Sequence, residues 1–175
     1  YKELGALRGE AGWSAERRYE KLASRDIQEA CDLFHPLYVR SDGEDGYVSL
    51  EVSPALAHDA EATIAAGLRL KAEVNRANVL IKVPATKAGL RAIEQLIGQG
   101  CSVNVTLMFS LDHVRDVSRA YMTGIEQWLG RSDAAPLPGQ SVASLFRGRV
   151  AQCVDNKLHA LRWAPLLLKA HPGDA

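Results

Sequence analysis

Residues 78–86, Asn-Val-Leu-Ile-Lys-Val-Pro-Ala-Thr, constrain the fold of this chain more than any other stretch. The aliphatic run predicts a buried β-strand that ends at Pro84, because proline has no N–H to donate to a continuing ladder. At the two-residue period of a strand, three aliphatic side chains face one way, while Leu80 and Lys82 face the other. The strand therefore carries an amine within an apolar segment.

Burying the ammonium group of Lys82 costs free energy, so its position asks for a physical reason. A lysine held in apolar surroundings is in part a neutral amine, and a neutral amine attacks carbonyl groups to form a Schiff base. The alternative is a lysine at a strand end whose charged group reaches solvent. The neighbouring strands bear on the choice between the two.

Strand and helix signals alternate along the chain after residue 46. Strands are predicted at 47–54, 79–84, 101–109 and 141–146. Helices are predicted at 59–74, 86–98, 110–130 and 149–163, with Ser110 or Asp112 as the cap of the third. This order is typical of a parallel sheet with right-handed crossovers.

The residues before the first strand predict two further helices and a loose lead-in. Glycines interrupt residues 1–12, so no element is expected there. Ser14 is a plausible N-cap for one helix and Ser24 for a second. Pro36 is expected to kink or shorten that second helix.

Polar side chains share one face of the predicted strands. The third strand is expected to set an aliphatic face against a polar one: Val103, Val105, Leu107 and Phe109 against Ser102, Asn104, Thr106 and Met108. With Glu51 and Lys82, the polar face resembles the upper interior of a (β/α) barrel, because both faces of an open doubly wound sheet are aliphatic. A buried ion pair between Glu51 and Lys82 is the alternative, although such pairs rarely add stability.

Composition excludes several function classes. Among 175 residues, Lys plus Arg and Asp plus Glu number 21 each, so no net charge favours nucleic acid or an acidic membrane surface. Three cysteines without CxxC spacing and five scattered histidines predict neither disulfides nor a metal site. With no apolar run long enough to span a membrane, we expect a cytoplasmic protein with buried thiols.

Four strand motifs resemble the transaldolase family, specifically its longer bacterial subgroup, and they occur in the family's order. The motifs are DGYVSLEVSP at 45–54, NVLIKVPAT at 78–86, NVTLMFS at 104–110 and SVASLF at 141–146. The resemblance runs from about Ser14 to about Leu161. It implies a (β/α)8 TIM-type barrel, with about four of the eight strands in this chain and one domain over residues 1–175.

The resemblance also implies roles for the residues of the polar face. Lys82 matches the Schiff-base lysine, and Glu51 matches the carboxylate that works through a water during proton transfer. Asn104 and Thr106 match the residues that orient the lysine and that water. The four would form the catalytic group of the family.

The resemblance implies that the substrates are sugar phosphates. Ser144 and Arg149 match the positions at which the family binds the phosphate end of the substrate. Arg147 could assist Arg149, but it is more simply a solvent-facing charge. A dihydroxyacetone unit would pass from sedoheptulose 7-phosphate or fructose 6-phosphate to an aldose phosphate, as in the pentose phosphate pathway, without metal or other cofactor. A related Schiff-base aldolase that releases its product is the alternative enzyme.

The chain also departs from the family at both ends. The family begins with two strands, one with its general-acid/base aspartate and the next with a Thr-Ser-Asn-Pro type motif, and this sequence contains neither. Residues 163–175 also do not match the further helix and the last two strands of the family. We therefore expect a truncated or frame-shifted product, or part of a longer protein. The non-enzyme alternative is an inactive half-barrel fragment that self-associates as a homo-oligomer through its open edges.

Overall fold

The structure, a computed structural model, describes residues 12–131 and 140–170, and the side chains as far as residue 162. The predictions for the lead-in, for most of the loop at 131–140 and for the side chains of the tail fall outside the described residues. Within the described residues, no helix is long and apolar enough to cross a membrane.

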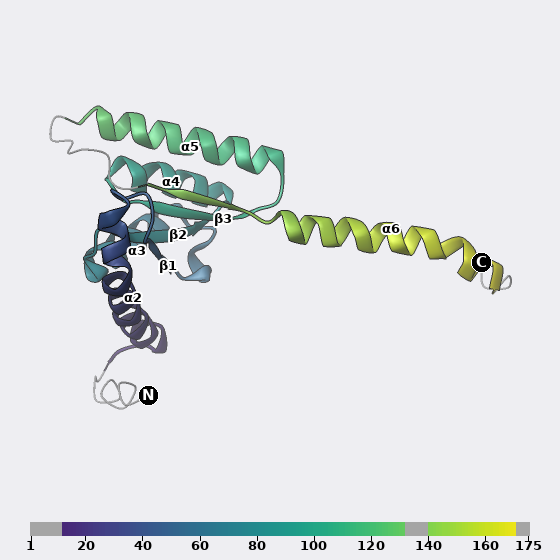
Figure 1. Ribbon diagram of the computed structural model, residues 1–175, viewed down its shortest axis with the longest axis horizontal. Helices are drawn as coiled ribbons and strands as arrows, with labels where there is room; N and C mark the ends of the chain where they lie inside the picture. Colours follow the sequence, from purple (N-terminus) through teal and green to yellow (C-terminus); the bar gives the residue numbers. More distant parts are fainter. Residues whose placement is uncertain (1–11, 132–139, 171–175) are drawn as a thin grey trace.

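The described chain folds around one parallel sheet in the order β1-β2-β3-β4. The strands are β1 (Val48–Glu51), β2 (Val79–Pro84), β3 (Val103–Met108) and β4 (Val142–Leu145). The helices α3 (Ala60–Val74), α4 (Lys87–Gly98) and α5 (Leu111–Leu129) connect successive strands. In Figure 1, α4 and α5 cover one side of the sheet, whereas α6 (Arg147–Ala170) extends away from it. The predicted α/β class and partial (β/α) barrel are confirmed.

One face of the sheet holds the hydrophobic core. Val79, Ile81 and Val83 of β2 are almost fully buried there, against aliphatic side chains of α3 and α4. Leu80 is equally buried but does not belong to this cluster, since its side chain lies on the opposite face. The two faces of β2 therefore differ as the sequence predicted, with the amine of Lys82 on the face away from the main core.

The face that carries Lys82 is concave. Asn104 of β3 donates a hydrogen bond across β2 to the Ser49 hydroxyl of β1, at 3.0 Å. The Tyr47 hydroxyl, just before β1, accepts one from the backbone N–H of Gln140, just before β4, at 2.9 Å. Because neighbouring strands lie about 4.8 Å apart, such contacts between non-adjacent strands require the sheet to curve toward this face. The curvature is that of a barrel wall.

Side-chain caps fix where the helices begin. The side chains of Asp59, Thr86 and Ser110 accept hydrogen bonds from the first turns of α3, α4 and α5. Ser110, and not Asp112, is therefore the cap of α5. Pro54 opens a short 3-10 turn, η1 (Pro54–Leu56), so β1 ends earlier than predicted.

A single helix, α2 (Ala15–Arg40), replaces the two helices predicted before the first strand. Ser24 is not a cap: its side chain is buried within this helix. The helix also continues through Pro36, which is exposed. There the carbonyl that loses its helical partner can be solvated, so the proline does not end the helix.

The end of β3 departs from the predicted alternation. Leu107 has φ +64°, and the pairing with β4 shifts register between Val105 and Met108. As a result Met108 is buried, whereas Leu107 and Phe109 are each 40% exposed. Placing Leu107 and Phe109 on the buried aliphatic face was wrong, because a bulge inserts a residue and reverses the sides that follow it.

Candidate active site

The polar residues of the concave face come from neighbouring strands at matching heights. In the sheet register, Glu51 of β1 is paired with Lys82 of β2, and Lys82 with Asn104 of β3. All three lie toward the carboxyl ends of their strands, the end at which (β/α) barrels carry their chemistry. The backbone pairing thus brings these residues together on one face, as the sequence predicted.

Lys82 and Glu51 form an open ion pair. The Lys82 amine lies 3.5 Å from a carboxylate oxygen of Glu51, and their side chains are 32% and 54% exposed. Neither the fully desolvated lysine nor the buried ion pair considered from the sequence describes this arrangement. A pair this exposed contributes at most about 1 kcal/mol to stability, so the fold does not depend on it.

Asn104 is held at both ends of its amide. Its nitrogen donates to the Ser49 hydroxyl at 3.0 Å, and its oxygen accepts from the Ser144 hydroxyl at 3.2 Å. These two contacts fix the orientation of the amide, level with Lys82 on the next strand. Ser144 thus joins the polar face directly from β4. The role of Ser49 was missed from the sequence, although its place two residues before Glu51 puts it on that face.

Thr106 and Arg149 lie less directly at the site. Thr106 is buried, at 2% exposure, and is paired with Pro84 in the strand register. Among the described residues, no hydrogen bond joins Thr106 to Lys82. Arg149 is exposed in the first turn of α6, with its guanidinium 4.7 Å from the centre of the Phe146 ring.

The described residues contain no group of three or more His, Cys, Asp or Glu side chains that could hold a metal ion. The groups available for chemistry on the concave face are therefore an amine, a carboxylate, an amide and hydroxyls. An amine beside a carboxylate is the minimal pair for forming an imine with a carbonyl compound, because the carboxylate can move the protons that the reaction releases and consumes.

A parallel α/β sheet that curves toward a lysine and a carboxylate at its strand ends is typical of the class of (β/α) barrels. The family model described as Transaldolase/Fructose-6-phosphate aldolase matches residues 1–173. The chain therefore belongs to the transaldolase/fructose-6-phosphate aldolase family.

Curated relatives agree with this assignment. The chain is 45% identical over 159 residues to "Transaldolase 1" of Streptomyces avermitilis, which is 90% of this chain and 42% of the relative. It is 46% identical over 156 residues to a transaldolase of Thiobacillus denitrificans, 89% of this chain and 43% of the relative. A Parafrankia transaldolase is 50% identical over 141 residues, 78% of this chain and 37% of the relative. The chain thus spans about two fifths of the length of these relatives.

Proposed function

We propose that this chain is the Schiff-base part of a transaldolase, which transfers a dihydroxyacetone unit from a ketose phosphate to an aldose phosphate. The observation that carries the proposal is the Lys82 amine 3.5 Å from the Glu51 carboxylate on the concave face. Family membership and relatives named transaldolase support the same reaction. Sedoheptulose 7-phosphate and fructose 6-phosphate are the proposed donors. The proposed place of the reaction is the pentose phosphate pathway in the cytoplasm.

The chemistry assigned to Lys82 is covalent catalysis. The neutral amine adds to the ketose carbonyl, and the carbinolamine loses water to give an iminium ion bonded to Nζ. Glu51 gives and takes the protons of these steps through a water molecule. A base then takes the proton of the C4 hydroxyl as the C3–C4 bond breaks, the electron pair of that bond moves into the iminium group to give an enamine, and the aldose phosphate leaves as an aldehyde. The enamine attacks the acceptor aldehyde, and hydrolysis returns the amine.

The neighbouring residues are proposed to position substrate and lysine. Asn104, fixed by Ser49 and Ser144, presents its amide beside Lys82 and restricts where the amine can lie. Thr106 would help to hold the water used by Glu51. Arg149 offers a fork of donors that suits the phosphate of the substrate. Together these assignments place the sugar along the concave face, with its carbonyl at Lys82.

Borohydride trapping with fructose 6-phosphate tests the proposal. Reduction of the imine should leave a stable adduct on Lys82, identified by peptide mass, and Lys82→Ala should abolish it. Lys87→Ala is the matched control, since Lys87 lies in the first turn of α4 rather than on the concave face. Equal trapping in the two variants would show that the nucleophile is another residue.

A Schiff-base aldolase is the second candidate, because the family description names fructose-6-phosphate aldolase as well. Both enzymes form the same enamine, and they differ in its fate. An aldolase protonates the enamine and releases free dihydroxyacetone, whereas a transaldolase holds it for the acceptor. Product analysis of the complete protein with and without an aldose phosphate acceptor separates the two.

A further inference from the structure

Helix α6 carries an apolar stripe that no other described part of the chain covers. Val150, Val154, Leu158 and Leu161 repeat at the spacing of one helix face, and they are 39%, 49%, 59% and 69% exposed. Helices α4 and α5 lie against the sheet, but α6 extends away from it (Figure 1). A stripe of this kind normally faces a partner.

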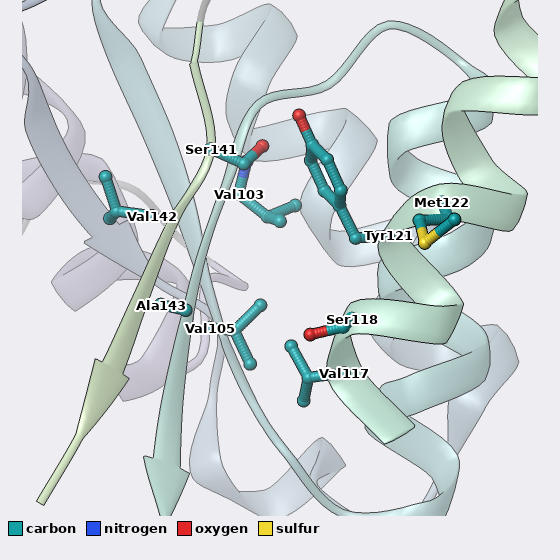
Figure 2. Close-up of a pocket in the computed structure, with 9 residues that line it drawn as sticks. All are labelled: Val103, Val105, Val117, Ser118, Tyr121, Met122, Ser141, Val142 and Ala143. Carbon is teal, nitrogen blue, oxygen red and sulfur yellow. The ribbon is translucent and has the colours of Figure 1, made fainter. Parts of the chain in front are cut away.

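An apolar groove lies open beside β4, on the side of the sheet that α5 covers. Figure 2 shows Val103 and Val105 of β3 pointing toward Val117 and Tyr121 of α5, and the hollow between them extends to β4. The cavity has a volume of about 230 Å³. At its rim Met122 is 61% exposed. Val117, Ser118, Tyr121 and Met122 of α5 line it, so the groove follows one side of that helix.

We propose that this groove binds α6 of a second copy of the chain, so that two chains exchange their α6 helices in a swapped dimer. The exchange would cover the groove of each chain with the stripe of the other, and both surfaces would leave solvent together. The proposal goes beyond the proposed enzymatic function and does not depend on it.

The register of the two helices supports this fit. A helix that covers a parallel strand runs antiparallel to it, so a docked α6 runs in the same direction as α5. With Leu111 and Arg147 level, Met122 of α5 faces Leu158 of α6. The apolar positions of the two helices therefore match in this register.

The connection before α6 favours a second copy over the chain's own helix. Two residues separate β2 from α4 and β3 from α5, whereas Phe146 alone separates β4 from α6. The backbone N–H of Phe146 is bonded to the Met108 carbonyl at 3.0 Å, and its ring packs on Phe109 with centroids 5.4 Å apart. Short connections that resist reversal favour exchange between chains. These contacts of Phe146 hold the connection in the conformation in which α6 extends away from the sheet.

The first test measures the mass of the purified chain in solution by light scattering across a concentration series. We expect a dimer. Leu158→Asp places a charge in the apolar stripe and should raise the dimer dissociation constant about tenfold or more, as should Met122→Asp in the groove. Asn156→Asp adds the same charge to the opposite face of α6 and should leave the dimer unchanged. A monomeric chain, or equal effects of Leu158→Asp and Asn156→Asp, would overturn the proposal.

The second test identifies which chain supplies the helix. Chains with Met122→Cys and chains with Leu158→Cys, both also carrying Cys153→Ala, are unfolded together, refolded and oxidised. Exchange predicts a disulfide-linked heterodimer that a reducing agent separates, because the two positions then face one another within disulfide distance. In a single chain with both cysteines, an intramolecular link without covalent dimer would show that α6 folds back on its own groove. That result would contradict the proposed exchange of helices.

Discussion

At the level of single residues, Lys82 lies between a charge and a neutral amide. Glu51 lies 3.5 Å from the amine, and Asn104 is level with it on the other neighbouring strand. The carboxylate is 54% exposed, so water reaches it, whereas the amide is bonded at both ends. The solvent-exposed carboxylate suits proton transfer through water, and the fixed amide suits positioning.

Arg149→Ala tests the proposed phosphate contact. The substitution should weaken binding of fructose 6-phosphate, by about tenfold or more if a charge-assisted contact is lost, and should leave binding of unphosphorylated dihydroxyacetone unchanged. The measurement is the concentration of each compound that gives half-maximal borohydride trapping. Equal losses for both compounds would assign Arg149 a structural role, and no loss would make it a surface arginine.

The pH dependence of the free energy of unfolding tests the charge network around Glu20. Its carboxylate accepts from Arg69 at 2.8 Å and from Arg17 at 3.4 Å, and the hydrogen bond from Arg69 is the main cause that holds the pKa of Glu20 below its ordinary value of 4.5. A lowered pKa means that the folded state favours the ionised form. The stabilisation is therefore complete above the unfolded pKa and is lost as the pH falls through the folded one.

Glu20→Gln should accordingly lower the free energy of unfolding by about 1 kcal/mol at neutral pH, and by much less once the pH is well below 4.5. Urea unfolding at both conditions measures the difference. Glu44→Gln, an exposed glutamate in the turn after α2, is the matched control and should change little at either pH. A cost for Glu20→Gln that does not depend on pH would mean that packing, and not charge, is responsible.

At the level of elements, the two-residue period predicted which face of β2 and β3 carries the polar side chains near Lys82, but it did not predict where a strand changes sides. Lys82 and Asn104 lie where the alternation placed them, because their strands are regular at those points. Leu107 and Phe109 do not, because the bulge at the end of β3 depends on pairing with β4, which lies more than thirty residues further along the chain. Local patterns contain no signal for such a bulge.

The helices also have some features that the local sequence predicts and others that depend on the folded chain. Caps such as Thr86 and Ser110 were predictable, because a hydroxyl before an amphipathic run has a local function. The joining of two predicted helices into α2 was not, because Ser24 is buried by contacts that only the folded chain supplies. The contact from Asn104 to Ser49 also required the curvature of the sheet, which sequence periodicity does not give.

Two glycines in helices should respond in opposite ways to alanine. A Cβ at Gly89 in the first turn of α4 would lie 1.9 Å from the Pro84 carbonyl oxygen, whereas one at Gly148 in α6 would meet nothing within 4 Å. Gly89→Ala should therefore destabilise the chain by about 2 kcal/mol or more, since a backbone atom must move. Gly148→Ala should stabilise α6 by about 0.5–1 kcal/mol.

Urea unfolding measures the first effect, and circular dichroism at the helix bands measures the second. If Gly89→Ala were as stable as the parent chain, the close approach of α4 to the end of β2 would be incorrect. If Gly148→Ala lowered helicity, α6 would not be a helix at that position.

At the level of the whole molecule, the concave face described here is part of the wall of a barrel. Its four strands present one lysine and one carboxylate, Lys82 and Glu51, among the described strand residues. Relatives more than twice as long carry the name transaldolase. The single-domain organisation expected from the sequence stays a prediction, because the sheet described here accounts for only part of such a barrel.

The last prediction is that the polypeptide of residues 1–175 forms the imine but turns over little substrate as a transaldolase. Cleavage of the C3–C4 bond needs a base on the C4 hydroxyl, and a positioned general base contributes about two to four powers of ten in rate. Glu51 is already assigned to the water of imine formation. With the Lys82 side chain 32% exposed, water also reaches the reacting centre and can protonate the enamine before the acceptor aldehyde reacts with it.

With fructose 6-phosphate as donor and erythrose 4-phosphate as acceptor, release of glyceraldehyde 3-phosphate measures cleavage, and formation of sedoheptulose 7-phosphate measures transfer. The same preparation must first trap fructose 6-phosphate on Lys82, so that a misfolded sample is not mistaken for an inactive one. Lys82→Ala, which loses the trap as well, gives the background rate. Turnover at ordinary enzyme values of about 1 to 1000 per second would contradict the argument, because it would require a second catalytic base close to the concave face.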